Sequence, residues 1–487
     1  MSDGGAADPG APRRILFLPA CMRGHAGPMM RLAECFVRAP GWEVHVWLGG
    51  PWRSMVPEGA TAHGEFGMEE GIEQWAASLA RVFAGLSDAP TWHASLAGMV
   101  TGCTSEDVLP SVEAFTVGAA RMVRMVAPRV VVADGAYQSG GRIPGLCRAL
   151  GATFVALQCP GRPEPWTKTW EVLSLLRKHG KELARAAPMG DRLNALLEAE
   201  TGPPLPDPEH TWLRLLPGCR ALVREPPTSQ EVFVGPFLPI AEHDLSGAQA
   251  HLQSHSADLA AWLDAGSPTD PVVYVAFGTL ARLNVALKYR LAAGLTGGAW
   301  RVLWSLPLAQ HDEVMSTFGK TPDGSRFRLE PFVPQAQVLA HPRVKCFMTH
   351  CGQNSIHEAV AAAVPMVCVP FYCDQYEWAS AVCKHRRAGL RLDKVTATAL
   401  DVRGAVRRVL DEPRFAANAR ACREDLLDAC QRADALLESS AVAHFASKAS
   451  CGGAPLAAAL IVGAVSKEAA AQTQPCKVER ACACAIQ

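Results

Sequence analysis

The sequence lacks an excess of charge of either sign, since 47 Lys and Arg balance 47 Asp and Glu among its 487 residues. Without a basic surplus the protein has no general attraction for the phosphates of a nucleic acid, so we expect no nucleic acid partner. A long apolar run is also missing near the start. Residues 15–22 are short and interrupted by Pro19, which indicates a first strand and no signal peptide.

Three motifs are absent as well. The 17 cysteines form no Cys-x-x-Cys pair, and no Asn-x-Ser/Thr site occurs; both absences favour a reducing compartment, and we expect a cytoplasmic protein. No Asp-x-Asp pair occurs either. The acidic ligands through which a divalent ion would hold a nucleotide diphosphate are therefore missing, and we predict no metal ion and no cofactor.

What the sequence does contain is a repeated alternation of apolar strands with helices. Helices are expected near residues 29–38 and 285–295. The expected strands are 14–19, 43–48, 129–134, 272–277, 301–306 and 345–349. This alternation predicts an α/β protein with two doubly wound parallel sheets, of the Rossmann-like kind, whose strand ends face each other across a cleft.

The composition suggests where the two halves separate. Residues around 241–269 are polar, which indicates a linker. Residues 449–466 are uncharged but diluted by Gly and Pro, which disfavours a membrane span. We therefore divide the chain into a first domain at 12–240, a linker at 241–269, a second domain at 270–435, a helix at 436–448 packing back on the first domain, and a flexible Ala/Cys-rich tail at 449–487.

The chain ends in Cys484-Ala485-Ile486-Gln487, which fits a prenylation box. Such a match arises easily in a tail rich in Ala and Cys. If the box is modified, it would attach the protein to a membrane; if it is not, the protein would be soluble.

The most informative segment lies between residues 332 and 375. A strand ending at Thr349 runs through a short turn into a helix expected to begin near Asn354 or Ser355. A helix start offers free backbone N–H groups and the positive end of the helix dipole, which suits a diphosphate. Polar side chains gather around this turn and after the next strand: His350, Asn354, Ser355, Glu358, Asp374 and Gln375.

Each of these side chains alone has a structural explanation. Asn354 and Ser355 would cap a helix. Glu358 would lie on a solvated face, and Asp374 would start a turn. The case for a binding site rests on their occurrence together.

Together, residues 332–375 resemble the nucleotide-sugar signature of the UDP-glycosyltransferases, especially the plant secondary-product type. The resemblance implies the GT-B fold, with a UDP-sugar as co-substrate on domain 270–435 and a small acceptor on domain 12–240. It implies that Phe332 stacks on uracil and that Gln335 contacts the edge of this base. It implies that Glu358 binds the ribose, and that Asp374 and Gln375 bind the sugar hydroxyls. The residues that it implies for the diphosphate are Gly278, Thr279, His350, Gly352, Asn354 and Ser355.

Three residues depart from the family pattern. Phe332 and Gln353 stand where plant members usually have Trp, and Ala363 stands where Gly is frequent. Phe332 can still stack on a base. Gln375 ends the segment as in the glucosyltransferases of the family, so UDP-glucose is the first donor to consider.

In the first half, Gly24-His25-Ala-Gly-Pro28 resembles the family's Gly-His-x-x-Pro element, which carries a catalytic His. We expect His25 to precede a helix, whose dipole would keep the imidazole neutral as a general base. Asp134, at the end of a strand, is where the resemblance places the acid that orients this base. The alternatives are a capping or core histidine and a turn-forming aspartate.

The sequence thus predicts an inverting, metal-independent transfer of a hexosyl group, first of all glucosyl, from a UDP-sugar to a hydroxyl of a small, lipophilic acceptor. Two alternatives stay open: a non-catalytic UDP-sugar-binding or regulatory protein, and a sugar-nucleotide epimerase of the same architecture.

Overall fold

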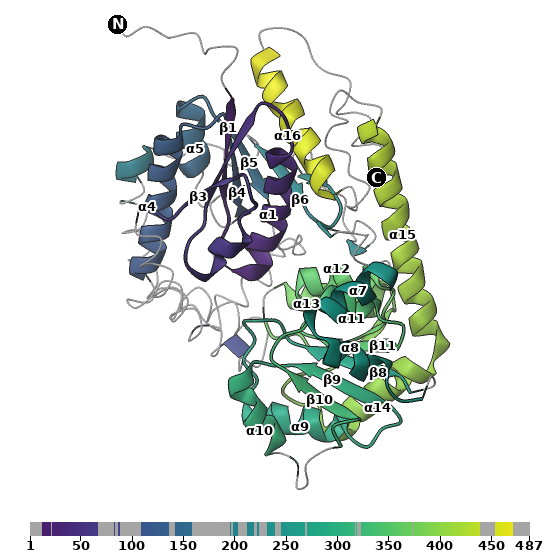
Figure 1. The fold of residues 1–487 in the computed structure, drawn as a ribbon. Coiled ribbons are helices and arrows are strands. Elements are labelled where there is room, and N and C mark those ends of the chain that lie inside the picture. The colour runs from purple at the N-terminus through teal and green to yellow at the C-terminus, as the bar shows by residue number, and fades with distance from the viewer. Residues whose placement is uncertain are drawn as a thin grey trace, which may run out of the picture.

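The computed structural model describes residues 12–20, 22–66, 82, 86–87, 109–135, 142–157, 195, 198–202, 212–218, 222–223, 231–238, 245–267, 270–316, 318, 323–372, 374–438 and 453–470. In these ranges the chain forms two separate sheets, each built of parallel strands with helices packed beside it (Figure 1). The expectation of two doubly wound α/β domains is confirmed.

The N-terminal sheet has the strand order β3-β2-β1-β4-β5-β6-β7 within the described residues. Its central strands are continuous apolar runs such as Val-Val-Val-Ala in β4, as expected for strands covered on both faces. The elements are β1 (Arg13–Leu18), α1 (Arg23–Val37), β2 (Trp42–Trp47), the 3-10 helix η1 (Gly50–Met55), β3 (Thr61–His63), α4 (Leu109–Val126), β4 (Val130–Asp134), α5 (Arg142–Ala149), β5 (Thr153–Leu157), β6 (Leu213–Leu216) and β7 (Glu231–Phe233).

The C-terminal sheet has the order β10-β9-β8-β11-β12-β13, again within the described part of the chain. Its strands are β8 (Val272–Ala276), β9 (Arg301–Ser305), β10 (Phe327–Glu330), β11 (Val344–Thr349), β12 (Met366–Cys368) and β13 (Gly389–Arg391). Its helices are α7 (Leu245–His255), α8 (Ala257–Asp264), α9 (Val285–Leu295), η5 (Leu308–Gln310), α10 (His311–Met315), α11 (Gln335–Ala340), α12 (Gln353–Ala361), α13 (Gln375–Ser380), the π-helical η6 (Ala381–His385), α14 (Ala399–Asp411) and α15 (Pro413–Glu438).

Residues 241–269, expected as a linker, contain the helices α7 and α8 instead. Leu252, Leu259, Trp262 and Leu263 are buried in the core of the C-terminal domain. Because these apolar residues are few among polar ones, the composition of residues 241–269 resembles that of a linker. One face of each helix is nevertheless buried in the domain core. The C-terminal domain therefore begins before α7.

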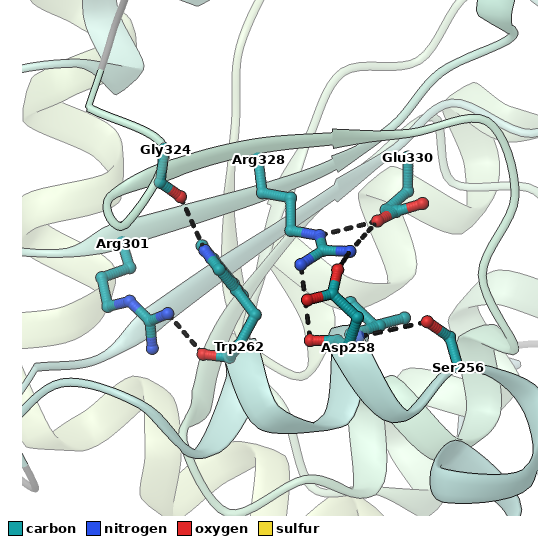
Figure 2. Close-up of polar contacts among 8 residues, drawn as sticks. Ser256, Asp258, Trp262, Arg301, Gly324, Arg328 and Glu330 are labelled. Atoms are coloured by element: carbon teal, nitrogen blue, oxygen red, sulfur yellow. Dashed lines mark hydrogen bonds and ion pairs between the residues drawn. The ribbon is translucent and has the colours of Figure 1, made fainter.

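Figure 2 shows how α8 is held against the sheet. Trp262 donates from Nε1 to the carbonyl oxygen of Gly324 at 2.8 Å, and the guanidinium of Arg301 lies 3.9 Å from the centre of the Trp262 ring. Arg328 of β10 binds Asp258 at 2.7 Å and Glu330 at 2.6 Å. Arg301 also donates to carbonyl oxygens at the C-terminal end of α8, where the helix leaves such acceptors without partners.

The tail at 449–487, expected to be flexible, contains a helix that is part of the first domain. Helix α16 (Gly453–Ala470) lies beside α1 in Figure 1, and Leu456, Ala457 and Ile461 are buried in the N-terminal core. The helix expected to pack back at 436–448 lies largely outside the described residues, and α16 makes that packing instead. Small Ala residues mixed with Leu, Ile and Val let α16 pack against α1, α15 and β5.

Among the helices that the structure describes, none combines the length and apolar character needed to cross a membrane. The prenylation-like box at residues 484–487 lies outside the described residues, so its modification stays a prediction.

Candidate active site

His25 and Asp134 meet at the ends of two neighbouring strands. Because β1 and β4 pair in parallel, their carboxyl ends lie at the same edge of the sheet. Asp134 ends β4 with 1% of its surface exposed, and its Oδ2 lies 2.8 Å from Nδ1 of His25. With Nδ1 held by the carboxylate, Nε2 is the ring nitrogen left to act on a bound hydroxyl.

Two details of His25 differ from expectation. It lies within the first turn of α1, which begins at Arg23. Its pKa also lies above the ordinary 6.5: burial lowers it, but the charge and hydrogen bond of Asp134 and the charge of Asp374 together outweigh burial. The expected lowering by the helix dipole is therefore wrong in direction, because two carboxylates stabilise the imidazolium.

Asp374 brings the second domain to this base. It immediately precedes α13, and its charge acts on His25 across the two domains. Burial raises the pKa of Asp374 to about 6, against the opposing effect of the His25 charge. Side chains expected to act on the acceptor and on the sugar are thus close enough to influence each other.

The turn after β11 has the predicted form. Gly352 is the N-cap of α12, and His350 lies against two glycines: a Cβ at Gly278 would be 2.7 Å from its Nε2, and one at Gly352 2.5 Å. Gly278 also has a φ of +70°, which favours glycine. Burial lowers the pKa of His350 to about 4, against the opposing effect of a hydrogen bond to the backbone of Ala276, so the imidazole is neutral at pH 7. Its Nδ1 is buried without a hydrogen-bond partner among the described residues.

The first turn of α12 contacts the other domain at two points. Asn354 donates from Nδ2 to the carbonyl oxygen of Gly24 at 2.9 Å. Gln353, which stands where the family usually has Trp, is buried and donates to the carbonyl oxygen of Pro217. The helix expected to hold the diphosphate therefore also links the two domains.

Ser355, Glu358 and Gln335 form one hydrogen-bonded group. Gln335, the first residue of α11, donates from Nε2 to Ser355 Oγ at 3.0 Å and to Glu358 Oε2 at 2.5 Å. Its Oε1 accepts from the hydroxyl of Tyr274 at 3.1 Å. In the structure the amide of Gln335 contacts Glu358, the residue expected to bind the ribose. The contact of Gln335 with the uracil edge therefore stays a prediction.

The remaining predicted residues lie in the same domain. Phe332 exposes 47% of its surface and meets the ring of His255 edge-on, with ring centres 6.0 Å apart. Thr279 is exposed beside Gly278. Gln375 is buried, and its Oε1 accepts from the backbone N–H of Phe371 at 2.8 Å, so its amide nitrogen is the end available to a sugar.

Sequence reasoning missed Tyr274. It lies within the apolar run Val-Val-Tyr-Val-Ala of β8 and is 1% exposed. A tyrosine inside a fully buried strand must find a partner for its hydroxyl, and that requirement is the signal that could have singled it out.

Across the described residues, no group of three or more His, Cys, Asp or Glu side chains has an arrangement that could hold a metal ion. The absence of a metal requirement stays a prediction, carried by the sequence.

Several known proteins resemble this chain. A family model described as UDP-glucoronosyl and UDP-glucosyl transferase matches residues 231–423. UDP-glycosyltransferase 84A3 of Arabidopsis thaliana is 33% identical over 33% of this chain and 34% of its own length. Cis-zeatin O-glucosyltransferase 2 of Zea mays is 30% identical over 40% of this chain and 44% of its own. The chain thus matches only about a third to a half of these relatives' length.

Solved structures match over more of the chain. The glycotransferase of kitacinnamycin aligns with 93% of this chain and 98% of its own, with a TM-score of 0.60 and 20% identity. Os79 from O. sativa, in complex with UDP, aligns with 85% and 96%, with a TM-score of 0.56 and 20% identity. At this identity the likeness establishes the fold, which is GT-B. Residues 231–423 of the chain are thus similar to the UDP-glycosyltransferases, both in the family model and in the curated relatives.

Proposed function

We propose that the protein transfers a hexosyl group from a UDP-sugar to a hydroxyl of a small acceptor, with inversion at the anomeric carbon. The observation that carries this proposal is the contact of His25 with Asp134 at 2.8 Å, together with the charge of Asp374 acting on His25 from the second domain. A base with its orienting acid thus lies beside the residues expected to hold the sugar.

In the proposed reaction, the acceptor hydroxyl gives its proton to Nε2 of His25 as its oxygen bonds to the anomeric carbon. The bond from that carbon to the diphosphate oxygen breaks on the opposite face, and UDP leaves with the bonding electrons. Asp134 stabilises the imidazolium that forms. The backbone N–H groups at the start of α12 and the neutral His350 meet the negative charge on the leaving diphosphate.

The glucosyl group is the first choice of sugar. The family's glucosyltransferases tend to have Gln at the position of Gln375. Two relatives from Zea mays are named as glucosyltransferases. A metal-independent reaction is favoured because the sequence holds no Asp-x-Asp pair. The UDP-sugar would thus be bound as a co-substrate by protein residues, without a metal ion.

The test is UDP release from UDP-glucose with a panel of phenolic, terpenoid and sterol acceptors, in the presence of EDTA. We expect acceptor-dependent release that falls by at least about 100-fold in His25→Ala. The anomeric proton of the product, read by NMR, should show inversion. Equal activity in both proteins would refute the role of His25. Tight UDP binding without turnover on any UDP-sugar would instead favour the non-catalytic binding protein.

A further inference from the structure

The hydroxyl of Tyr274 lies at the start of a chain of hydrogen bonds that ends at Glu358. The tyrosine is buried in β8, and its ring stacks on Phe347 of β11, with ring centres 5.0 Å apart and an interplanar angle of 8°. This packing fixes the ring in the sheet. Its hydroxyl reaches Oε1 of Gln335 at 3.1 Å.

The chemistry of the groups fixes the direction of this chain. A carboxylate only accepts hydrogen bonds, so the atom of Gln335 that faces Glu358 must be the nitrogen. The oxygen of the same amide then faces Tyr274 and must accept, which makes the phenol the donor. Burial, and then the negative charge of Glu358, raise the pKa of Tyr274 well above its usual value, against the opposing effect of a hydrogen bond with Ser305. The phenol therefore keeps the proton that it donates.

Glu358 sets which way the amide of Gln335 points, and Tyr274 anchors the amide in that orientation by occupying its oxygen. Without the phenol, the amide oxygen loses this partner, and the amide is less firmly held against Glu358. Ser355 receives the second N–H of the same amide at 3.0 Å. One buried hydroxyl therefore anchors an amide that contacts two side chains of α12.

We propose that Tyr274 is a positioning residue for ribose recognition: acting through Gln335, it holds the carboxylate of Glu358 where the 2′- and 3′-hydroxyls of a uridine nucleotide are bound. This inference rests on the proposed function, because it assigns the ribose of the UDP-sugar to Glu358. It adds a residue that touches no substrate atom but sets the preference for a ribonucleotide over its 2′-deoxy counterpart.

The test compares the binding of UDP and of 2′-deoxyuridine diphosphate by titration calorimetry, which requires no turnover. We expect the wild type to bind UDP at least about 10-fold more tightly, as a hydrogen bond from the 2′-hydroxyl to a carboxylate would give. Tyr274→Phe removes only the hydroxyl and should reduce this ratio to about 3-fold or less, through weaker UDP binding. In turnover it should raise KM for UDP-glucose with little change in kcat.

Tyr376→Phe is the matched control, since its hydroxyl donates to the carbonyl oxygen of Phe371 and not to Gln335. Its UDP to 2′-deoxy ratio should equal that of the wild type. Gln335→Met interrupts the series of hydrogen bonds between Tyr274 and Glu358 without changing β8. It replaces Tyr274→Phe as the test variant if Tyr274→Phe does not fold. The double variant should lose no more selectivity than either single one.

The outcomes separate the two proposals. A wild type that does not bind UDP would overturn the proposed function and this inference with it. A wild type that prefers UDP, with the full preference retained in Tyr274→Phe, would overturn this inference alone. Additive losses in the double variant would also overturn it, because Tyr274 would then not act through Gln335.

Discussion

The side-chain amide of Asn354 in α12 donates to the main-chain carbonyl oxygen of Gly24 in α1, with a distance of 2.9 Å. In a regular helix that oxygen would accept from the N–H of the residue four positions later, which here is Pro28. Proline has no N–H, so the oxygen is left for an outside donor. The second domain uses this acceptor one residue before His25, and the base is thereby tied to the helix proposed to bind the diphosphate.

Asn354→Asp tests this link, because it replaces the donor by a negatively charged acceptor of the same shape. The new carboxylate would face both the Gly24 carbonyl oxygen and the proposed diphosphate. We expect kcat/KM for the UDP-sugar to fall by about 100-fold or more. Initial rates against donor concentration measure it.

Asn418→Asp is the matched control, since its amide also donates to a main-chain carbonyl oxygen, that of Arg387, at 2.9 Å. It should leave kcat/KM within about 3-fold of the wild type. Equal losses in the two variants would show that the effect of Asn354 is one of general stability.

The raised pKa of His25 predicts the pH dependence of the reaction. A general base must be neutral, so activity should rise with pH through the pKa of His25, above 6.5. Asp134→Asn removes the charge and hydrogen bond that raise this pKa. The acid limb of the kcat/KM profile should therefore move to lower pH, and kcat should fall by about 100-fold or more because the imidazolium loses its partner. An acid limb at the wild-type position would contradict the assignment.

The same shift has a consequence for folding. Because the pKa of His25 is raised in the folded protein, protonated His25 stabilises the fold below pH 6.5, and this contribution is lost as the pH rises through the folded-state pKa. Urea unfolding of the wild type and Asp134→Asn across this range measures the difference. The destabilisation by the variant should be larger at the acidic end.

Ala363 offers a prediction of increased stability. It follows α12 with a φ of +54°, where its N–H donates to the carbonyl oxygen of Val360 and that of Val364 donates to Ala359. This arrangement is a Schellman motif, whose left-handed residue is usually Gly. Ala363→Gly should raise the free energy of unfolding by roughly 0.5–1 kcal/mol. Ala361→Gly, inside the helix, should lower it by a similar amount, and equal signs for the two would refute the explanation.

The sequence predicted best what depends on local pattern. The strands expected at residues 14–19, 43–48, 129–134, 272–277, 301–306 and 345–349 are β1, β2, β4, β8, β9 and β11, and the turn from Thr349 into α12 has the expected form. Other strands of both sheets, such as β5 and β10, were not predicted. The direction of the pKa shift of His25 was missed although its partner Asp134 was predicted, because packing sets the balance of burial against the charges of Asp134 and, from the other domain, Asp374. The partners of Gln335 were equally out of reach, since Tyr274 approaches it from a different strand. Residues 245–264 looked like a linker because their covered faces appear only in the fold, where α7 packs on α11 and α8 meets Arg301 of β9 and Arg328 of β10.

Helix α16 shows the same limit and gives the last prediction. Its residues looked like a low-complexity tail, yet Ile461 is fully buried between α16 and the N-terminal core, and Gly463 on the same helix is exposed with nothing near a would-be Cβ. Ile461→Ala should lower the free energy of unfolding by about 2–5 kcal/mol, through lost apolar contact and the cavity left behind.

Gly463→Ala is the control in the same helix and should raise stability by about 0.5–1 kcal/mol, since alanine favours the helical backbone and meets no clash. Urea unfolding monitored by circular dichroism compares both variants with the wild type. If α16 were a detached tail, Ile461→Ala would unfold at the wild-type midpoint. A large loss of unfolding free energy in Ile461→Ala, together with a small gain in Gly463→Ala, would show that α16 is packed on the domain. Only a packed helix face makes the two positions differ in this way.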